Sequence, residues 1–239
     1  MPTLNHPAHN AAIFDTPSIV SKLPHVGTTI FTVMSALAAE KQAVNLGQGF
    51  PDFDCYPTLI DAATSAMQHG LNQYPPMTGV PALREAISRK IASLYGHHYN
   101  PQNEITITAG ATQALLTAIQ CCVHTDDEVI VIEPAFDSYL PAIALAGGKA
   151  VCVQMEVGAA GYTVPWHKIA AAITTRTRLI LINSPHNPSG SILRASDLQA
   201  LADIVRGTDI LILSDEVYEH MVYDGMQHES VCRHPESVS

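Results

Sequence analysis

Positive charge is scarce in this chain of 239 residues. Only 12 lysine and arginine residues stand against 22 aspartate and glutamate residues, which gives a formal net charge of −10 at pH 7. A surface with so few cations is not expected to bind a nucleic acid or an anionic membrane. No apolar run reaches the roughly 20 residues that a membrane-spanning helix needs. The first twenty residues contain neither lysine nor arginine and no continuous apolar stretch, so the sequence predicts no secretory or mitochondrial leader and a cytoplasmic location.

The cysteines and histidines lack the spacing of a disulfide framework or a metal site. The five cysteines show no pairing pattern, and Cys121 and Cys122 are adjacent on a predicted helix, so reduced and mostly buried thiols are favoured over disulfides. His228, Cys232 and His234 are spaced loosely like metal ligands. Because a fourth ligand and a paired Cys-x-x-Cys are missing, a polar surface loop is favoured over a zinc site.

What the sequence does contain, from residue 104 onward, is a regular alternation of short apolar runs and amphipathic segments. Continuous apolar strands separated by amphipathic helices are typical of βαβ units, in which a parallel sheet is covered on both faces. The pattern therefore predicts an α/β fold. The predicted strands are 104–108, 128–132, 150–155, 178–182 and 209–213, and the predicted helices are 111–123, 137–146, 166–173 and 195–205.

Before residue 104 the pattern is different. A mostly irregular arm contains one helix-like stretch at 32–40, and two further helices are predicted at 58–69 and 80–95. No repeat, no low-complexity tract and no linker between independent domains is visible.

Two polar motifs each follow an apolar strand directly. Residues 183–190 read Asn-Ser-Pro-His-Asn-Pro-Ser-Gly, and residues 214–218 read Ser-Asp-Glu-Val-Tyr. Open α/β sheets bind ligands at the carboxyl ends of their strands. Asp215 can pair with a protonated pyridine nitrogen, while Asn187 and Tyr218 can hydrogen-bond a phenolate oxygen, which are the needs of a pyridoxal phosphate ring. Asn187 is also a common turn residue before proline, and the two interpretations are compatible because the turn places the amide.

Two further turns are candidates for the same site. Residues 108–114 form a strand end, a glycine turn and a helix start, where backbone N–H groups can bind a phosphate, although an ordinary capped turn has the same appearance. Phe136 follows the next strand, where its ring can stack on a pyridinium or can simply belong to the core.

Together these motifs resemble the class I aminotransferases, a fold type I family dependent on pyridoxal 5′-phosphate, across residues 20–235. The resemblance implies the three-layer α/β/α large domain of these transferases. It also implies that the cofactor phosphate binds at Gly110, Ala111 and Thr112, that Phe136 stacks on the ring, that Asp215 holds the ring nitrogen, and that Asn187 and Tyr218 contact the phenolate.

The upstream motifs resemble the branch that contains methionine aminotransferases, kynurenine aminotransferases and glutamine transaminase K. Residues 45–53 form a glycine-rich turn, in which the resemblance implies that Gly49 lies near the substrate carboxylate. Tyr74 matches a tyrosine that reaches across a homodimer to the phosphate of the neighbouring subunit, although it could equally be an ordinary loop tyrosine before a pair of prolines. The implied reaction moves an amino group between an amino acid (methionine, aromatic or glutamine-like) and a 2-oxo acid.

One element of that chemistry is absent. The family binds its cofactor through a Schiff-base lysine about three dozen residues beyond the ring-nitrogen aspartate. Only 24 residues follow Asp215, and all five lysines precede it: Lys22, Lys41, Lys90, Lys149 and Lys168. We therefore expect the N-terminal portion of an aminotransferase, with no catalytic residue of its own and no transaminase activity. Residues 1–45 would be the arm and part of the small domain, and residues 46–239 would be an incomplete large domain that lacks its last sheet strands and the C-terminal small domain.

Two alternatives share these residues. One is a carbon–sulfur β-lyase acting on cysteine conjugates, and the other is a truncated binding module without catalysis. The resemblance also places the two strands that follow in sequence between the fifth strand and the first. The strand at 104–108 is then expected to lack neighbours, which would disfavour a compact monomer.

Overall fold

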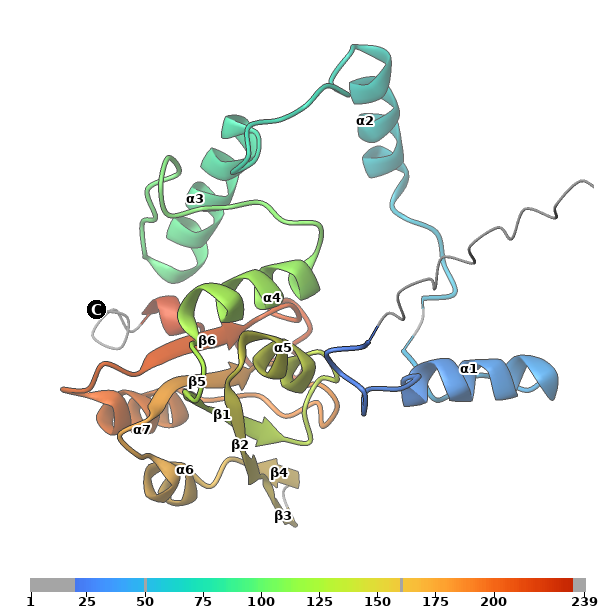
Figure 1. Ribbon diagram of the computed structural model, residues 1–239. Coiled ribbons are helices and arrows are strands. Elements are labelled where there is room, and N and C mark those ends of the chain that lie inside the picture. Colours follow the sequence, from blue (N-terminus) through green and yellow to red (C-terminus); the bar gives the residue numbers. More distant parts are fainter. Residues whose placement is uncertain (1–19, 50, 160, 234–239) are drawn as a thin grey trace, which may run out of the picture.

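A parallel sheet of four strands forms the centre of the molecule (Figure 1), and the computed structural model describes residues 20–49, 51–159 and 161–233. The strands are β1 (Glu128–Glu133), β2 (Lys149–Gln154), β5 (Thr177–Asn183) and β6 (Leu211–Asp215). They lie in the order β2-β1-β5-β6, and every neighbouring pair is parallel. All carboxyl ends therefore meet at one edge of the sheet, where the polar motifs begin.

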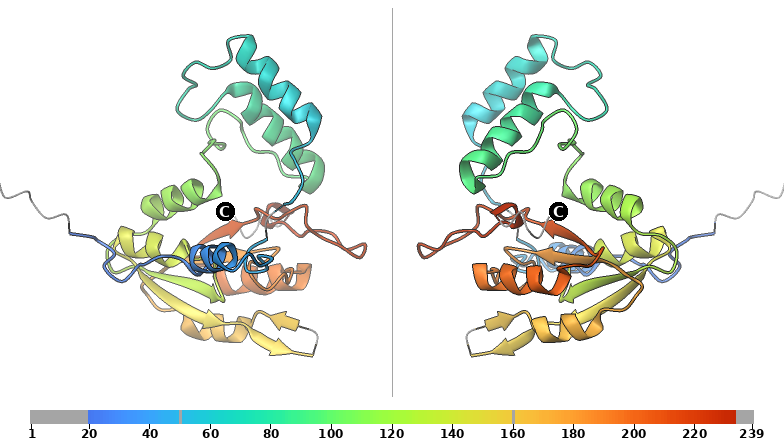
Figure 2. Two further views of the ribbon diagram at one scale, coloured as in Figure 1. Left: turned by 90° about the vertical axis from the view of Figure 1, so that its right-hand side faces the viewer. Right: turned by 90° about the vertical axis from the view of Figure 1, so that its left-hand side faces the viewer.

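Helices cover both faces of the sheet (Figure 2). On one face, Val131 and Leu181 pack against α4 (Ala111–Cys122) and α5 (Tyr139–Ala146). On the other, Ile130 and Ile180 pack against α6 (Trp166–Ala172) and α7 (Ala195–Val205). Successive strand residues point to opposite faces, so an unbroken apolar strand fills two cores. The predicted α/β/α arrangement is confirmed.

The N-terminal region consists of helices that stand away from the sheet. These are α1 (Ile30–Glu40), α2 (Pro57–Gln68) and α3 (Pro81–Tyr95). Neither α1 nor α2 contains a buried residue, and α3 contains only Arg84. The C-terminal end of α3 contacts the short helix η1 (Val231–Arg233). All three helices begin and end within three residues of the predicted bounds.

The structure corrects the sequence analysis at three points. Residues 104–108 are not a strand: the Ile107 N–H donates to the Thr78 carbonyl at 3.1 Å, and no described strand pairs with the segment. An extended apolar segment becomes a strand only when a neighbour accepts its backbone hydrogen bonds. A small antiparallel hairpin of β3 (Glu156–Gly158) and β4 (Gly161–Thr163) was not predicted, because three-residue strands leave too little pattern. The thiols are free as expected but none is buried.

Within the described ranges, no helix combines the length and the apolar character needed to cross a bilayer.

Candidate active site

A pocket of about 160 Å³ opens where β5 and β6 end. Six of the nine predicted site residues line it, and they come from four separate segments of the chain. The lining residues are Ala111, Thr112, Leu115, Phe136, Tyr139, Asn183, Asn187, Asp215, Val217 and Tyr218. Parallel strand order brings these segments together, because each follows the carboxyl end of a strand or begins a helix on the same side.

Asp215 is the buried carboxylate of this pocket. It ends β6 opposite Asn183 of β5 and is only 8% exposed. Its Oδ1 accepts the Val217 N–H at 3.2 Å, and its Oδ2 accepts the Tyr139 hydroxyl at 2.7 Å. Burial of a carboxylate is unfavourable without such partners. Both partners are neutral, so the carboxylate remains available to a cation in the pocket.

Tyr139 lines this pocket but was not singled out from the sequence. It begins α5 and is 2% exposed. Burial, reinforced by the hydrogen bond to the Asp215 carboxylate, raises the pKa of the Tyr139 phenol far above its ordinary value of 10. The phenol therefore stays protonated and donates. Its position one helical turn after Phe136, at a helix start beside the predicted site, is the signal that could have found it.

Phe136 forms the aromatic wall of the pocket. Its ring meets that of Tyr139 edge-on, with centroids 5.7 Å apart and an interplanar angle of 79°. Edge contacts of this kind are favourable and fix the orientation of both rings. Phe136 therefore serves packing and pocket lining at once, so the two interpretations of this residue are compatible.

Two asparagines connect the strand ends. The Asn183 side-chain amide donates to the backbone carbonyl of Asp215 at 2.8 Å, and its Oδ1 accepts the Asn187 N–H at 2.7 Å. Asn183 thus fixes the turn that presents Asn187 to the pocket. His186 does not line the pocket; its Nδ1 lies 2.7 Å from the Ser189 hydroxyl, and burial lowers its pKa below the ordinary value.

The first turn of α4 supplies backbone donors. Gly110 is its N-cap with φ of +86°, a left-handed conformation that glycine adopts without strain. The first N–H groups of a helix have no partner within the helix and carry partial positive charge. Ala111 and Thr112 of this turn line the pocket, so the donors open toward the same space as Asp215.

Three of the nine predicted residues do not line this pocket: Gly110, which caps α4 beside it, and Gly49 and Tyr74, which lie away from it. Gly49 is exposed, with open space where a side chain would project, and Tyr74 is fully exposed between α2 and α3. Tyr74 was assigned by resemblance to the pocket of a second subunit, which a single chain does not test. Both assignments stay predictions.

The neighbouring carboxylate, Glu216, has a structural environment. Its Oε1 accepts the Ser214 hydroxyl at 2.8 Å and the Val231 N–H at 3.2 Å, and its Oε2 lies 2.9 Å from His228 Nε2. Burial alone would raise the pKa of Glu216, but these hydrogen bonds outweigh it and hold the pKa below the ordinary value. Glu216 therefore anchors the segment after β6 instead of facing the pocket.

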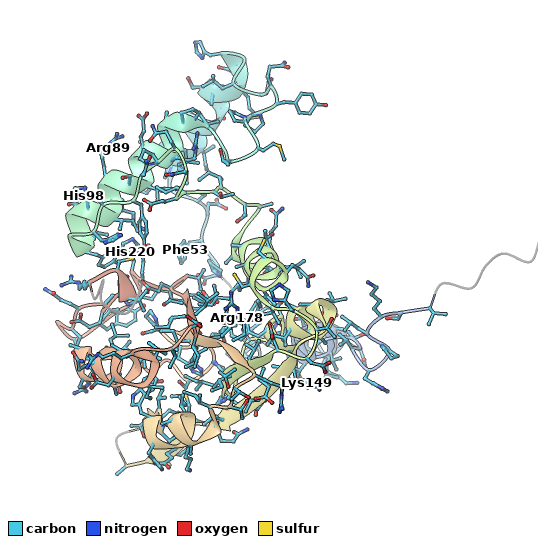
Figure 3. The ribbon with its side chains drawn as sticks, turned by 60° about the vertical axis from the view of Figure 1, so that its left-hand side comes forward. Phe53, Arg89, His98, Lys149, Arg178 and His220 are labelled. Carbon is cyan, nitrogen blue, oxygen red and sulfur yellow. The ribbon has the colours of Figure 1, made fainter. Side chains whose placement is uncertain are left out.

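That segment lies against α3. In Figure 3, Arg89 and His98 mark α3 and the turn behind it, and His220 marks the turn after β6. The Tyr95 hydroxyl of α3 donates to Glu219 at 2.6 Å, and Lys90 forms an ion pair with the same carboxylate. No group of three or more potential ligands in the described part of the chain is placed to hold a metal ion, and His234 lies outside that part.

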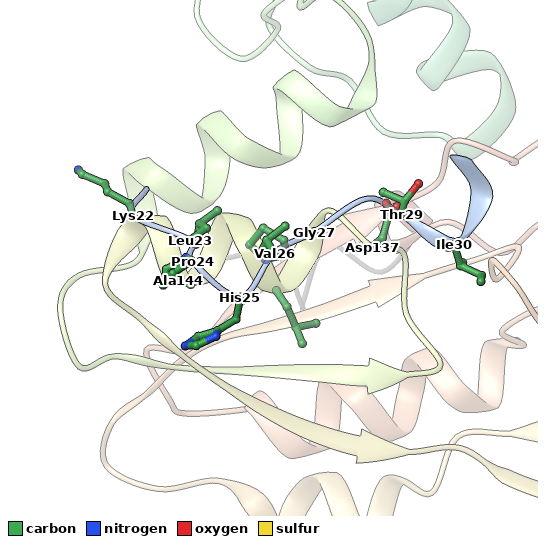
Figure 4. Close-up of a pocket in the computed structure, with 12 residues that line it drawn as sticks. Lys22, Leu23, Pro24, His25, Val26, Gly27, Thr29, Ile30, Asp137 and Ala144 are labelled. Atoms are coloured by element: carbon green, nitrogen blue, oxygen red, sulfur yellow. The ribbon is translucent and has the colours of Figure 1, made fainter. Parts of the chain in front are cut away.

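A second pocket is larger but has no comparable chemistry. It measures about 530 Å³ and lies between residues 22–30 of the arm and α5 (Figure 4). Leu23, Pro24 and Leu140 give it apolar walls, and it contains no convergent set of polar groups. Size alone does not identify a functional site, so the smaller pocket at the strand ends is the candidate.

Comparison with known proteins settles the family. The model for Aminotransferase class I and II matches residues 41–238. This chain belongs to that family. A methionine aminotransferase of Escherichia coli (strain K12) is 49% identical over 216 residues, which cover 90% of this chain and 55% of that protein. Human kynurenine–oxoglutarate transaminase 1 is 38% identical over 214 residues, which cover 83% of this chain and 50% of that protein.

The fold agrees with this aminotransferase membership. A crystal structure of a methionine aminotransferase from Escherichia coli matches with a TM-score of 0.87 and 48% identity, over 92% of this chain and 57% of that one. The chain spans about half the length of the curated relatives it matches. The family depends on pyridoxal phosphate.

Proposed function

We propose that the pocket at the ends of β5 and β6 binds pyridoxal 5′-phosphate. We further propose that the protein acts in transfer of an amino group between an amino acid and a 2-oxo acid. The observation that carries this proposal is the buried Asp215 carboxylate, which faces a pocket that also holds an aromatic wall and a helix N-terminus. A cationic ring that also carries an anionic group uses all three features.

The donor set fits this cofactor group by group. Asp215 would hold the proton of the pyridine nitrogen, and Phe136 would stack on the ring. Asn187 and Tyr218 would donate to the phenolate oxygen. The backbone of Gly110, Ala111 and Thr112 would take the phosphate at the start of α4.

When bound, the cofactor supplies an electron sink for the negative charge that develops on the amino acid. The described residues would orient the ring, keep a proton on its nitrogen through Asp215, and exclude water with Phe136 and Leu115. No lysine lines the pocket, so we propose that residues 1–239 bind the cofactor without turning substrate over.

Substrate and assembly are part of the same proposal. We propose a methionine, aromatic or glutamine-like amino acid as the amino donor, because the relatives include a methionine aminotransferase and kynurenine transaminases. Gly49 would lie near its carboxylate. Tyr74, fully exposed on its loop, would reach the phosphate of a second copy in a homodimer.

Titration of the purified protein with pyridoxamine 5′-phosphate tests the site. This form has no aldehyde, so it cannot react with surface lysines, and binding is followed by its fluorescence. Asp215→Ala should weaken binding about 100-fold, since hydrogen bonds to charged groups contribute about 1.5–3 kcal/mol. The matched control is Glu216→Ala, which removes the adjacent carboxylate and should have a much smaller effect. Equal dissociation constants for the two variants would show that the wrong carboxylate has been assigned.

A further inference from the structure

The hydrogen bond between Tyr139 and Asp215 connects two elements that sequence separates by 76 positions. The hydroxyl belongs to the first residue of α5, and the carboxylate to the last residue of β6. The donor–acceptor distance is 2.7 Å, and the two side chains are 2% and 8% exposed. A charge-assisted hydrogen bond shielded from water in this way is among the stronger polar contacts in proteins.

We propose that Tyr139 is a positioning residue that orients the Asp215 carboxylate toward the ring nitrogen of the bound cofactor. The inference rests on the proposed function. Tyr139 holds Oδ2 from the α5 side, and the Val217 N–H holds Oδ1 from the turn after β6. Rotation of the carboxylate would break one of these bonds, so the group is fixed before any ligand enters. Each carboxylate oxygen keeps a free lone pair for a further donor.

Tyr139 is itself held in place. Its N–H donates to the Phe136 carbonyl at 3.2 Å, its ring meets the Phe136 ring edge-on, and it packs in the core cluster that contains Leu115 and Ile143. The hydroxyl can therefore be removed without moving the ring. Among the residues that the structure describes, Tyr218 is the titratable group besides Asp215 that acts on the Tyr139 phenol, and it lines the same pocket.

A ligand that differs only at the ring nitrogen separates positioning from packing. Pyridoxamine 5′-phosphate can pair with Asp215, whereas its 1-deaza analogue has a carbon in place of the nitrogen and cannot. If Tyr139 acts through Asp215, then Tyr139→Phe should weaken binding of pyridoxamine 5′-phosphate about tenfold and leave the deaza analogue within about twofold. The ratio of the two dissociation constants, which measures the preference for the nitrogen-containing ligand, would fall by about tenfold as well.

The matched control is Tyr223→Phe, because Tyr223 is 70% exposed and lies outside both pockets. It should bind both ligands as the unaltered protein does. Equal weakening of the two ligands by Tyr139→Phe, or no weakening of either, would overturn the positioning role. If Tyr139→Phe does not fold, 4-fluorophenylalanine at position 139 fills the volume of the hydroxyl but cannot donate a hydrogen bond to Asp215. An unchanged ligand preference in that variant would overturn the role as well.

Failure of the proposed function gives a different result. In that case the unaltered protein would bind neither ligand, or would bind both with the same affinity regardless of Asp215→Ala. Binding that depends on Asp215 but not on Tyr139 would remove only the further inference.

Discussion

The sheet region and the N-terminal helices form equally regular secondary structure but differ in what they bury. Ile130 and Ile180 of the sheet are fully buried, whereas Ile30 of α1 and Leu59 of α2 are 66% and 61% exposed. The difference is not one of composition, since α1 is mostly apolar along its whole length. It shows that an apolar helix can be specified locally while its packing depends on a surface that the described residues do not provide.

Local signals account for the bounds of the N-terminal helices. The Thr29 hydroxyl accepts the Thr32 N–H at the start of α1, proline opens α2 and α3, and Gly96 ends α3 with φ of +76°. These are favourable starts and stops for a helix. Helices of this length are nevertheless marginal in water without tertiary packing. The pocket, by contrast, lies entirely within the region that has a core.

The largest expected difference between the two regions is in how much the free energy of unfolding falls when an isoleucine is replaced by alanine. Ile180→Ala, in the central strand β5, should lower the free energy of unfolding by about 3 kcal/mol because it leaves a cavity in a filled core. Ile60→Ala makes the same change in α2, where the side chain is 48% exposed, and should cost less than about 0.5 kcal/mol. Urea unfolding followed by circular dichroism measures both. Similar costs would mean that α2 packs in solution as tightly as the sheet.

A smaller loss of stability is expected from a substitution in α3, where a buried arginine makes polar contacts instead of apolar ones. Arg84 is 8% exposed and donates to the carbonyls of Gly79, Pro101 and Gln102. Arg84→Met should cost about 2 kcal/mol because three carbonyls lose a charged donor. We expect hydrogen exchange to accelerate in α3 while the amides of β5 keep their protection.

The exposed Arg89 provides the control for this prediction, because Arg89→Met removes the same charge from the same helix. It should leave exchange in α3 unchanged. Loss of protection in β5 as well as in α3 would show that the two regions unfold as one unit.

The smallest expected effect concerns the segment that joins the regions, and it depends on pH. The pKa of Glu216 is held below its ordinary value of 4.5, so the folded state favours the ionised form. Its contribution to stability is therefore present above pH 4.5 and is lost as the pH falls through the lowered pKa of the folded state. Glu216→Gln should be less stable than the unaltered protein by about 1 kcal/mol at pH 7, and the gap should close in acid.

Thermal unfolding between pH 3 and pH 7 measures that gap. Glu85→Gln is the matched control, because Glu85 is exposed on α3, and it should follow the unaltered protein throughout. A gap for Glu216→Gln that stays constant with pH would mean that its hydrogen bonds with Ser214, His228 and Val231 do not depend on charge.

Much of the candidate site could be predicted from the sequence. Asp215 and Asn187 follow apolar runs that are typical of buried strands, and parallel strands end at one edge, so their side chains were expected to converge. The aromatic after β1 follows the same logic. The glycine turn before α4 follows a segment that forms no strand, and the packing of α4 on the sheet places it. The family follows from these motifs, and the match over residues 41–238 confirms it.

Only the tertiary structure decided which contacts complete that arrangement. Tyr139 becomes a partner of Asp215 because α5 packs on the sheet with its first turn beside the end of β6, a relation between residues 76 positions apart. Residues 104–108 have the pattern of a strand but form none, and α1 is mostly apolar but contains no fully buried residue. The reason is the same in each case. Local sequence fixes which conformation a segment prefers and which face is apolar, whereas hydrogen-bond partners and burial depend on which surface lies opposite.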